Sequence, residues 1–417
     1  MMKKNLFAAL LVLAFQLSYS QISNFQTLLR SGITAFKAES QRTDTADYSS
    51  AFLQLDSAVK LDPQNAEAHY FLGYAMDRMT IFDGRGLTLS SRSRAEKISA
   101  QFELVNQLEP EYMGERILLD PYSKLTSTWA SLAQAYLTKG QPDSAKWAFR
   151  EGKRRGGFIE PVLSISRQLL NSCHKNAILV TYGDIITFPA WYLQTIEQYR
   201  TDITVVDATL LNTVWYPQFL KQEKKLKMGY ANDQLDTLSY ALWSPQRITI
   251  PNPRFAGKAV SWTMNATYYG EYVLRGDRIL LDIFRKNMFD RDLYFSSGAD
   301  TSINLFLTDY IVDDGLVDLV LTDKNDINDP RAILSENLSA YTIKYLNKSD
   351  IRRSPDAVSL LNLYRSTYCT NIGFLLSKGK TAEAKKLLKE MDERFPLSIL
   401  PYSYMENNIE ELRQKLK

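Results

Sequence analysis

The feature that most constrains the fold is a pair of short apolar runs separated by one helix-length segment. The first run covers residues 177–181 and is apolar at nearly every position, and the second covers 203–207 with Ile203, Val205 and Val206 as its apolar residues. Runs of this kind are typical of strands that are buried on both faces of a sheet. Between them, Thr187 is placed to cap a helix and Pro189 fits its first turn, so we expect the helix to begin there. These lengths predict a right-handed βαβ unit with parallel strands.

Further strands and helices are expected downstream, within residues 170–345. Candidate strands cover 247–250, 293–296 and 316–321, and a helix over 277–287 precedes the second of them. We therefore predict an α/β fold class for the centre of the chain, with a parallel, Rossmann-like sheet between all-α segments.

Ligands of open parallel sheets bind just beyond the carboxyl ends of the strands, and the amino end of a helix there favours an anion. Two simpler interpretations stay open: Gly183 allows a tight turn, and Asp184 caps the following helix. Ser296 and Ser297 follow another candidate strand at the same edge. The candidate ligand-binding residues are Tyr182, Gly183, Asp184, Thr187, Trp191, Asp207, Asn212 and Trp215.

Helical repeats are expected on both sides of this domain. Residues 126–159 match the tetratricopeptide (TPR) pattern of aromatic, leucine, small residue and aromatic, then a turn glycine and a second helix. A unit over 66–110 carries an insertion, and a weaker unit precedes it. We predict TPR-like repeats over 21–165 and a C-terminal helical hairpin over 355–417. The repeats serve as a scaffold, as a concave surface that docks a protein partner, or as both.

The first 20 residues have the three parts of a secretory signal peptide. Lys3 and Lys4 precede an apolar stretch of about 10 residues, which is too short to span a bilayer, and small residues precede a cut near Ser20–Gln21. No later apolar run approaches 18 residues. We therefore expect a periplasmic or secreted protein that is not embedded in a membrane.

Composition narrows the classes of function. Removing the two lysines of the signal peptide lowers the formal net charge from +3 to about +1, which gives no support for nucleic-acid binding. The chain has two histidines, so no multi-histidine metal site is expected, and His174 is a lone base or a surface histidine. Nucleophile-elbow, phosphate-loop and dinucleotide motifs are missing from the sequence, so we expect no cofactor and favour a non-enzyme. In an exported protein, Cys173 and Cys369 form a disulfide or remain free.

Several ordered segments resemble a known family. They cover residues 181–194, 199–202, 210–216 and 291–295, and a helical pair over 365–401 follows them. Together they resemble the soluble C-terminal region of bacterial glycosyltransferase-like multipass membrane proteins, which are similar to protein O-mannosyltransferases. The resemblance implies the fold and an extracytoplasmic location. It implies no catalysis, because the family's transferase chemistry belongs to a membrane-embedded half, and Ile185–Ile186 stand where the family usually has Asn-Asp.

These observations predict an exported, non-catalytic binding or scaffold protein of the cell envelope that docks a protein or glycan-bearing partner. Two alternatives stay open. One is an enzyme acting on a sugar or a phosphorylated compound beside Gly183 and Asp184, and the other is a purely structural subunit of an envelope complex.

Overall fold

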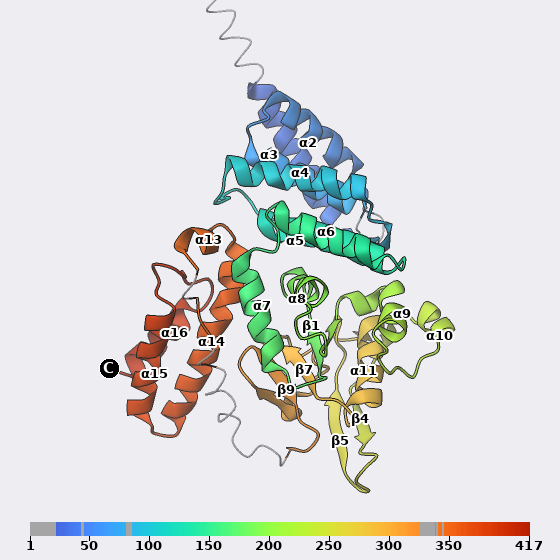
Figure 1. The fold of residues 1–417 in the computed structure, drawn as a ribbon, viewed down its shortest axis with the longest axis vertical. Helices are drawn as coiled ribbons and strands as arrows, with labels where there is room; N and C mark the ends of the chain where they lie inside the picture. The colour runs from blue at the N-terminus through green and yellow to red at the C-terminus, as the bar shows by residue number, and fades with distance from the viewer. Residues whose placement is uncertain (1–21, 43–45, 81–85, 325–337, 339–340, 344–345) are drawn as a thin grey trace, which may run out of the picture.

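The computed structural model describes residues 22–42, 46–80, 86–324, 338, 341–343 and 346–417 (Figure 1). The predicted signal peptide lies outside these ranges. Within them, no helix combines the length and the apolar character that crossing a bilayer requires.

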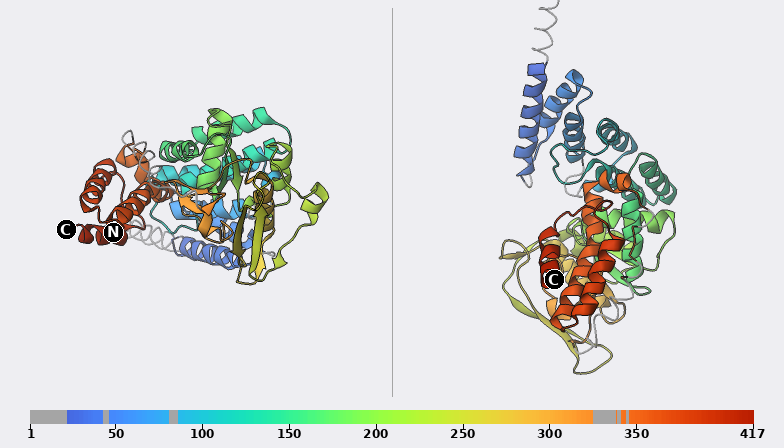
Figure 2. Two further views of the ribbon diagram at one scale, coloured as in Figure 1. Left: turned by 90° about the horizontal axis from the view of Figure 1, so that it is seen from below. Right: turned by 90° about the vertical axis from the view of Figure 1, so that its left-hand side faces the viewer.

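The amino-terminal part is a stack of helices that packs consecutively along the chain (Figures 1 and 2). The TPR-like pattern over 126–159 falls on two of them, joined by a turn in which Gly140 has φ +66°. Gly152 lets this pair approach closely, since a Cβ there would lie 2.5 Å from the Cβ of Trp129. Residues 22–40 are helical, followed by α2 (Ser49–Leu61), α3 (Ala66–Arg78), η1 (Leu87–Leu89), α4 (Arg92–Leu108), α5 (Pro121–Leu137) and α6 (Pro142–Arg154).

A five-stranded sheet forms the centre, in the order β2-β1-β7-β9-β8. β1 pairs in parallel with both β2 and β7, as predicted. β9 runs antiparallel to β7 and β8, so the sheet is mixed, with its parallel part at β2, β1 and β7. A short turn after Asp313 joins β8 to β9 as a hairpin, which makes these two strands antiparallel, so they cannot both run parallel to β7. The strands are β1 (Ile178–Thr181), β2 (Thr204–Asp207), β7 (Leu293–Ser296), β8 (Ile311–Asp313) and β9 (Val317–Val320).

The helix between β1 and β2 begins earlier than expected. α8 (Asp184–Ile196) starts three residues before Thr187, and Pro189 lies inside it. Gly183 ends the strand with φ +81°, and its carbonyl accepts the N–H groups of Ile186 and Thr187. The helix therefore starts at the glycine turn, which leaves the Thr187 side chain for another role. The other helices of this region are α7 (Glu160–Ser172), η2 (Leu210–Asn212), α9 (Trp215–Gln222), α10 (Asn232–Thr237), α11 (Arg275–Asn287) and η3 (Thr308–Tyr310).

Two small antiparallel ribbons project beside the sheet. The strand predicted at 247–250 lies in β4 (Gln246–Pro251), which pairs with β5 (Ala259–Met264) and does not join the central sheet. A short loop connects these strands, so they pair locally as a hairpin. The second ribbon consists of β3 (Ala241–Leu242) and β6 (Tyr272–Val273).

Four helices complete the chain and pack beside α7 (Figure 1). The guanidinium of Arg365 is buried and donates to the carbonyls of Phe395 and Leu400 at 2.6 and 2.7 Å, which fixes the end of the hairpin. The helices are α13 (Lys348–Arg352), α14 (Pro355–Ser377), α15 (Thr381–Arg394) and α16 (Glu406–Lys415). The predicted combination of an α/β domain with flanking helical segments is confirmed.

Two contacts tie these parts together. α5 and α6 pack on α8, so the last helices of the amino-terminal stack share an apolar core with the sheet. The amino ends of α5 and α14 cap each other: the Asp120 carboxylate accepts the N–H of Asp356 at 3.0 Å, and the Asp356 carboxylate accepts the N–H of Asp120 at 2.8 Å. A cavity lies along the contact between α5 and α8.

Candidate functional site

A cavity of about 510 Å³ lies where the helices α3 and α5 face the carboxyl ends of β1 and β2. This size is within the range of ordinary ligand pockets. The two sides come from regions far apart in the sequence. Its lining residues are Tyr74, Asp77, Arg78, Leu87, Leu118, Leu119, Lys124, Ser127, Ser131, Tyr182, Gly183, Asp184, Ile185, Ile186, Phe188, Asp207, Thr209 and Leu210.

The strand side is shaped by the turn that ends β1. The positive φ of Gly183 directs the chain into α8, so Tyr182 and Asp184 lie on either side of the turn at the cavity. Asp184 is the first residue of α8, where a carboxylate is favourable because the exposed N–H groups of the helix end carry partial positive charge. The first turn of α8 also contributes Ile185 and Ile186, which are the two positions that depart from the resembling family.

Asp207 is held by the residues around it. Its Oδ2 accepts the Thr187 hydroxyl at 2.5 Å, and its Oδ1 accepts the Leu210 N–H at 2.8 Å. Thr181 and Thr187 are joined by a further hydrogen bond of 2.8 Å. Burial raises the pKa of Asp207 to about 6, although these hydrogen bonds oppose the shift. Asp207 thus joins β2 to α8 and has a structural role.

Asp184 bridges the two halves of the site. Its Oδ2 accepts the hydroxyl of Ser127 on α5 at 2.6 Å, which joins the start of α8 to the helical stack. Burial raises the pKa of Asp184, and the Ser127 hydrogen bond and the positive charge of Lys124 oppose the shift. Asp184 is half-buried and stands at the cavity wall. It is the carboxyl best placed to accept a hydrogen bond from a ligand.

A buried ion pair lies on the helical side. The Lys124 ammonium is 2.6 Å from the Asp77 carboxylate, and the two side chains are only 5% and 8% exposed. The ammonium also lies 4.7 Å from the centre of the Tyr74 ring, within the range of a cation–π interaction. Because charges in such a site require a partner, the pair fixes α3 against α5 at the cavity.

The structure brings half of the predicted site residues together. Tyr182, Gly183, Asp184 and Asp207 all line the cavity.

The other four serve the framework. Thr187 is buried against Asp207, and Trp191 is buried between the rings of Phe188 and Tyr216. Asn212 accepts the Gly276 N–H at 2.8 Å, and Trp215 packs on neighbouring aromatic rings.

Sequence reasoning missed the helical half of the site, formed mainly by Tyr74, Asp77, Lys124 and Ser127. One signal was present: Lys124 is a charged residue in a helix whose other positions are mostly apolar or small. Its partner Asp77 is 47 positions away, so no local pattern connects the two residues. Among the described residues, no cluster of three or more His, Cys, Asp or Glu is arranged to hold a metal ion.

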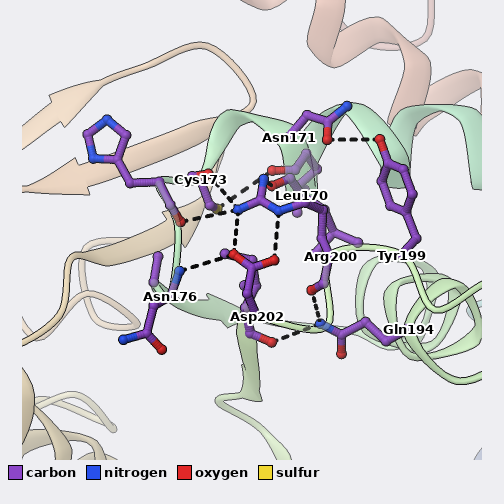
Figure 3. Close-up of polar contacts among 12 residues, drawn as sticks. Leu170, Asn171, Cys173, Asn176, Gln194, Tyr199, Arg200 and Asp202 are labelled. Atoms are coloured by element: carbon purple, nitrogen blue, oxygen red, sulfur yellow. Dashed lines mark hydrogen bonds and ion pairs between the residues drawn. The ribbon is translucent and has the colours of Figure 1, made fainter.

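Residues at the amino ends of the strands, on the side of the sheet away from the cavity, explain part of the motif at 199–202 that resembles the known family. Arg200 forms a two-pronged ion pair with Asp202, with both distances 2.9 Å, and also donates to the carbonyls of Leu170 and Cys173 (Figure 3). The Asp202 carboxylate accepts the Asn176 N–H at 3.0 Å. These contacts tie the end of α7 to the starts of β1 and β2, so the motif is structural.

In the structure Cys173 and Cys369 are both free thiols, and Cys173 is buried.

His174 also lies at the amino ends of the strands. Its ring is 61% exposed and contacts the Asp292 carboxylate at 2.9 Å. This edge is the one away from the cavity, because the cavity lies at the carboxyl ends of the strands.

A comparison with protein families finds a match in the centre of the chain. The model of a family described as TMEM260-associated domain 2 matches residues 162–233, and that domain is linked to a glycosyltransferase-like membrane protein family. The matched segment runs from α7 into α10 and contains all eight predicted site residues. It includes the strand side of the cavity and none of the helical side. No TPR family model matches, and no curated protein matches the chain.

Proposed function

We propose that this chain is an exported, non-catalytic binding protein of the cell envelope that docks a protein or glycan-bearing partner. The observation that carries the proposal is the cavity between the helical stack and the strand ends. Helical repeats present surfaces that bind other proteins, and the carboxyl ends of parallel strands are a common position for ligands. A group of the partner that enters the cavity contacts both parts of the chain at once.

Export is supported by the signal-peptide pattern of residues 1–20. A role beside glycosylated molecules is supported by the ordered motifs of the central region and by the match over 162–233.

The alternative is an enzyme that acts on a sugar or a phosphorylated compound. The observation in its favour is the raised pKa of both Asp184 and Asp207, because perturbed carboxyl groups in a cavity are common at active sites. Hydrolysis of a glycosidic bond ordinarily uses two carboxyl groups. Here Asp207 is occupied by Thr187 and by the Leu210 N–H, and Asp77 is paired with Lys124, so neither carboxyl is placed to serve Asp184 as a second acid or base.

The test is a comparison of partners captured in the producing cells. Ile185→Trp fills the cavity from the first turn of α8, and Leu53→Trp makes the same type of change on the exposed surface of α2, where Leu53 is 63% exposed. The chain and both variants are crosslinked in envelope preparations and purified, and the attached proteins are identified by mass spectrometry.

The proposal predicts a partner that the unchanged chain and Leu53→Trp capture equally and that Ile185→Trp loses. Equal capture by all three chains contradicts docking through the cavity. Conversion of a sugar or sugar phosphate by the purified chain, abolished in Asp184→Ala, supports the enzyme instead.

A further inference from the structure

The cavity has a distinct chemical character. Much of its wall is apolar or aromatic, formed by Tyr74, Leu119, Tyr182, Ile186, Phe188 and Leu210. Leu118 also lines it and remains 67% exposed, so the apolar surface continues to the outside of the molecule. Such a wall favours an apolar group, and the three aromatic rings favour an aromatic one because rings pack edge to face.

Most of the charged groups at the cavity have a partner of opposite charge within the chain. The charged lining residues are Asp77, Arg78, Lys124, Asp184 and Asp207, which are three acids and two bases. Lys124 is paired with Asp77, and Arg78 interacts electrostatically with Asp184. An anionic ligand would have to displace Asp77 from Lys124, which would leave a buried carboxylate without a partner. It would also approach the carboxyl of Asp184, so the site disfavours phosphate.

The Asp184 carboxyl can accept a further hydrogen bond from a ligand. Asp207 already accepts hydrogen bonds on both of its oxygens, whereas among the described residues the half-buried Asp184 carboxyl accepts only the Ser127 hydroxyl, on Oδ2. A carboxylate has room for several donors. A ligand that brings an O–H or N–H group to Asp184 therefore adds a hydrogen bond without adding charge.

We infer that the cavity receives a tyrosine or tryptophan side chain of a partner protein. Both residues combine an aromatic body with one hydrogen-bond donor, and both are common anchors at protein interfaces. The phenol or indole group donates to Asp184 while the ring packs against the apolar wall. This inference rests on the proposed function, since it assigns the group that the partner inserts.

The test uses small amino-acid probes and the isoleucines of the cavity as reporters. Methyl-labelled Ile185 and Ile186 are observed by NMR in the chain without its first 20 residues, and they are assigned by Ile→Val substitution. The probes are N-acetyl-tyrosinamide, the phenylalanine analogue that lacks the hydroxyl, the phosphotyrosine analogue, and methyl glucoside as a neutral sugar.

The inference predicts that the tyrosine probe shifts both methyl signals. The phenylalanine probe should bind roughly tenfold more weakly, because it lacks one hydrogen bond. The phosphotyrosine probe should be weaker still. Asp184→Ala should remove the difference between tyrosine and phenylalanine, and Asp233→Ala on the exposed surface of α10 should preserve it.

Three outcomes overturn the inference: phosphotyrosine binds as well as tyrosine, glucoside alone shifts the signals, or no probe shifts them up to its solubility limit. None of these three outcomes bears on the proposed function itself, which the crosslinking and partner-capture experiment tests separately. Binding of the tyrosine probe together with equal partner capture by all three chains would instead contradict the proposed function alone.

Discussion

The buried pair of Lys124 and Asp77 gives the sharpest prediction about the site. Lys124→Met removes the ammonium and keeps most of the side-chain volume. It leaves the Asp77 carboxylate, 8% exposed, without the partner that stood 2.6 Å away. The contact of the ammonium with the Tyr74 ring at 4.7 Å is lost as well.

The expected cost follows from the burial of both groups. Removing one member of a buried ion pair destabilises proteins by about 3–5 kcal/mol, because the remaining charge is desolvated and unpaired. Replacing both members by apolar residues of similar volume is often close to neutral. The double variant Lys124→Met with Asp77→Leu should therefore lie within about 1.5 kcal/mol of the unchanged chain.

The assay is urea unfolding of the chain without its first 20 residues, followed by circular dichroism and tryptophan fluorescence. The control is Lys37→Met, which breaks an ion pair of 2.6 Å whose side chains are 51% and 48% exposed. Such surface pairs contribute about 0–1 kcal/mol. Equal losses in the single and double Lys124 variants, or a single loss no larger than the control, would refute the role given to this pair.

Three further predictions concern stability. Gly152→Ala should lower the free energy of unfolding by about 1–3 kcal/mol, because its methyl group would lie 2.5 Å from the Cβ of Trp129 on the facing helix. Gly373→Ala has open space around the new methyl group and should stabilise α14 by about 0.5–1 kcal/mol. Thermal melts that rank the two variants in the opposite order would contradict the packing described. The hydrogen bond from Arg200 lowers the pKa of Asp202 to about 2, so its stabilisation is present above pH 4 and is lost as the pH falls toward 2. Asp202→Asn should remove the loss of stability between pH 4 and 2 that Asp202 causes. An unchanged dependence of stability on pH in this range would contradict the role given to the Arg200–Asp202 pair. Burial raises the pKa of Asp120 to about 7, so its stabilising contribution is complete below about pH 4 and disappears as the pH rises through 7. Asp120→Asn should flatten the loss of stability between about pH 4 and 7, and an equally steep loss in this variant would count against the raised pKa of Asp120.

The part of the fold that the sequence predicted best is the parallel half of the sheet. β1, β2 and β7 are short and mostly apolar in their middle positions, which marks them as strands covered on both faces. The direction of β9 was missed because its apolar run looks the same in either orientation. Direction is set by the connection, and here that connection is a short turn from β8.

The start of α8 shows a similar limit. Thr187 and Pro189 form a good local signal for a helix start, yet the positive φ of Gly183 starts the helix earlier. Thr187 is then free to bind Asp207, a contact that depends on β2 lying beside β1. Local sequence patterns describe local preferences, and this contact is set by the sheet.

The candidate site was predicted on one side only. The rule that ligands bind beyond parallel strands placed Tyr182, Gly183, Asp184 and Asp207 correctly at the cavity. The helical side required knowing that α3 and α5 pack over the strand ends, which no pattern within either segment reveals. Residues such as Lys124 become interpretable only when their distant partners are seen.

The central claim, that a partner docks at this cavity, is tested most directly by photo-crosslinking in the producing cells. A benzophenone amino acid is placed at Leu118, which lines the cavity and is 67% exposed, and in a second chain at Leu53, which is 63% exposed on α2. We expect one protein to crosslink from position 118 and not from position 53, and to be lost when Ile185→Trp fills the cavity. The same crosslinks from both positions, or crosslinks from position 118 that survive Ile185→Trp, would contradict the claim.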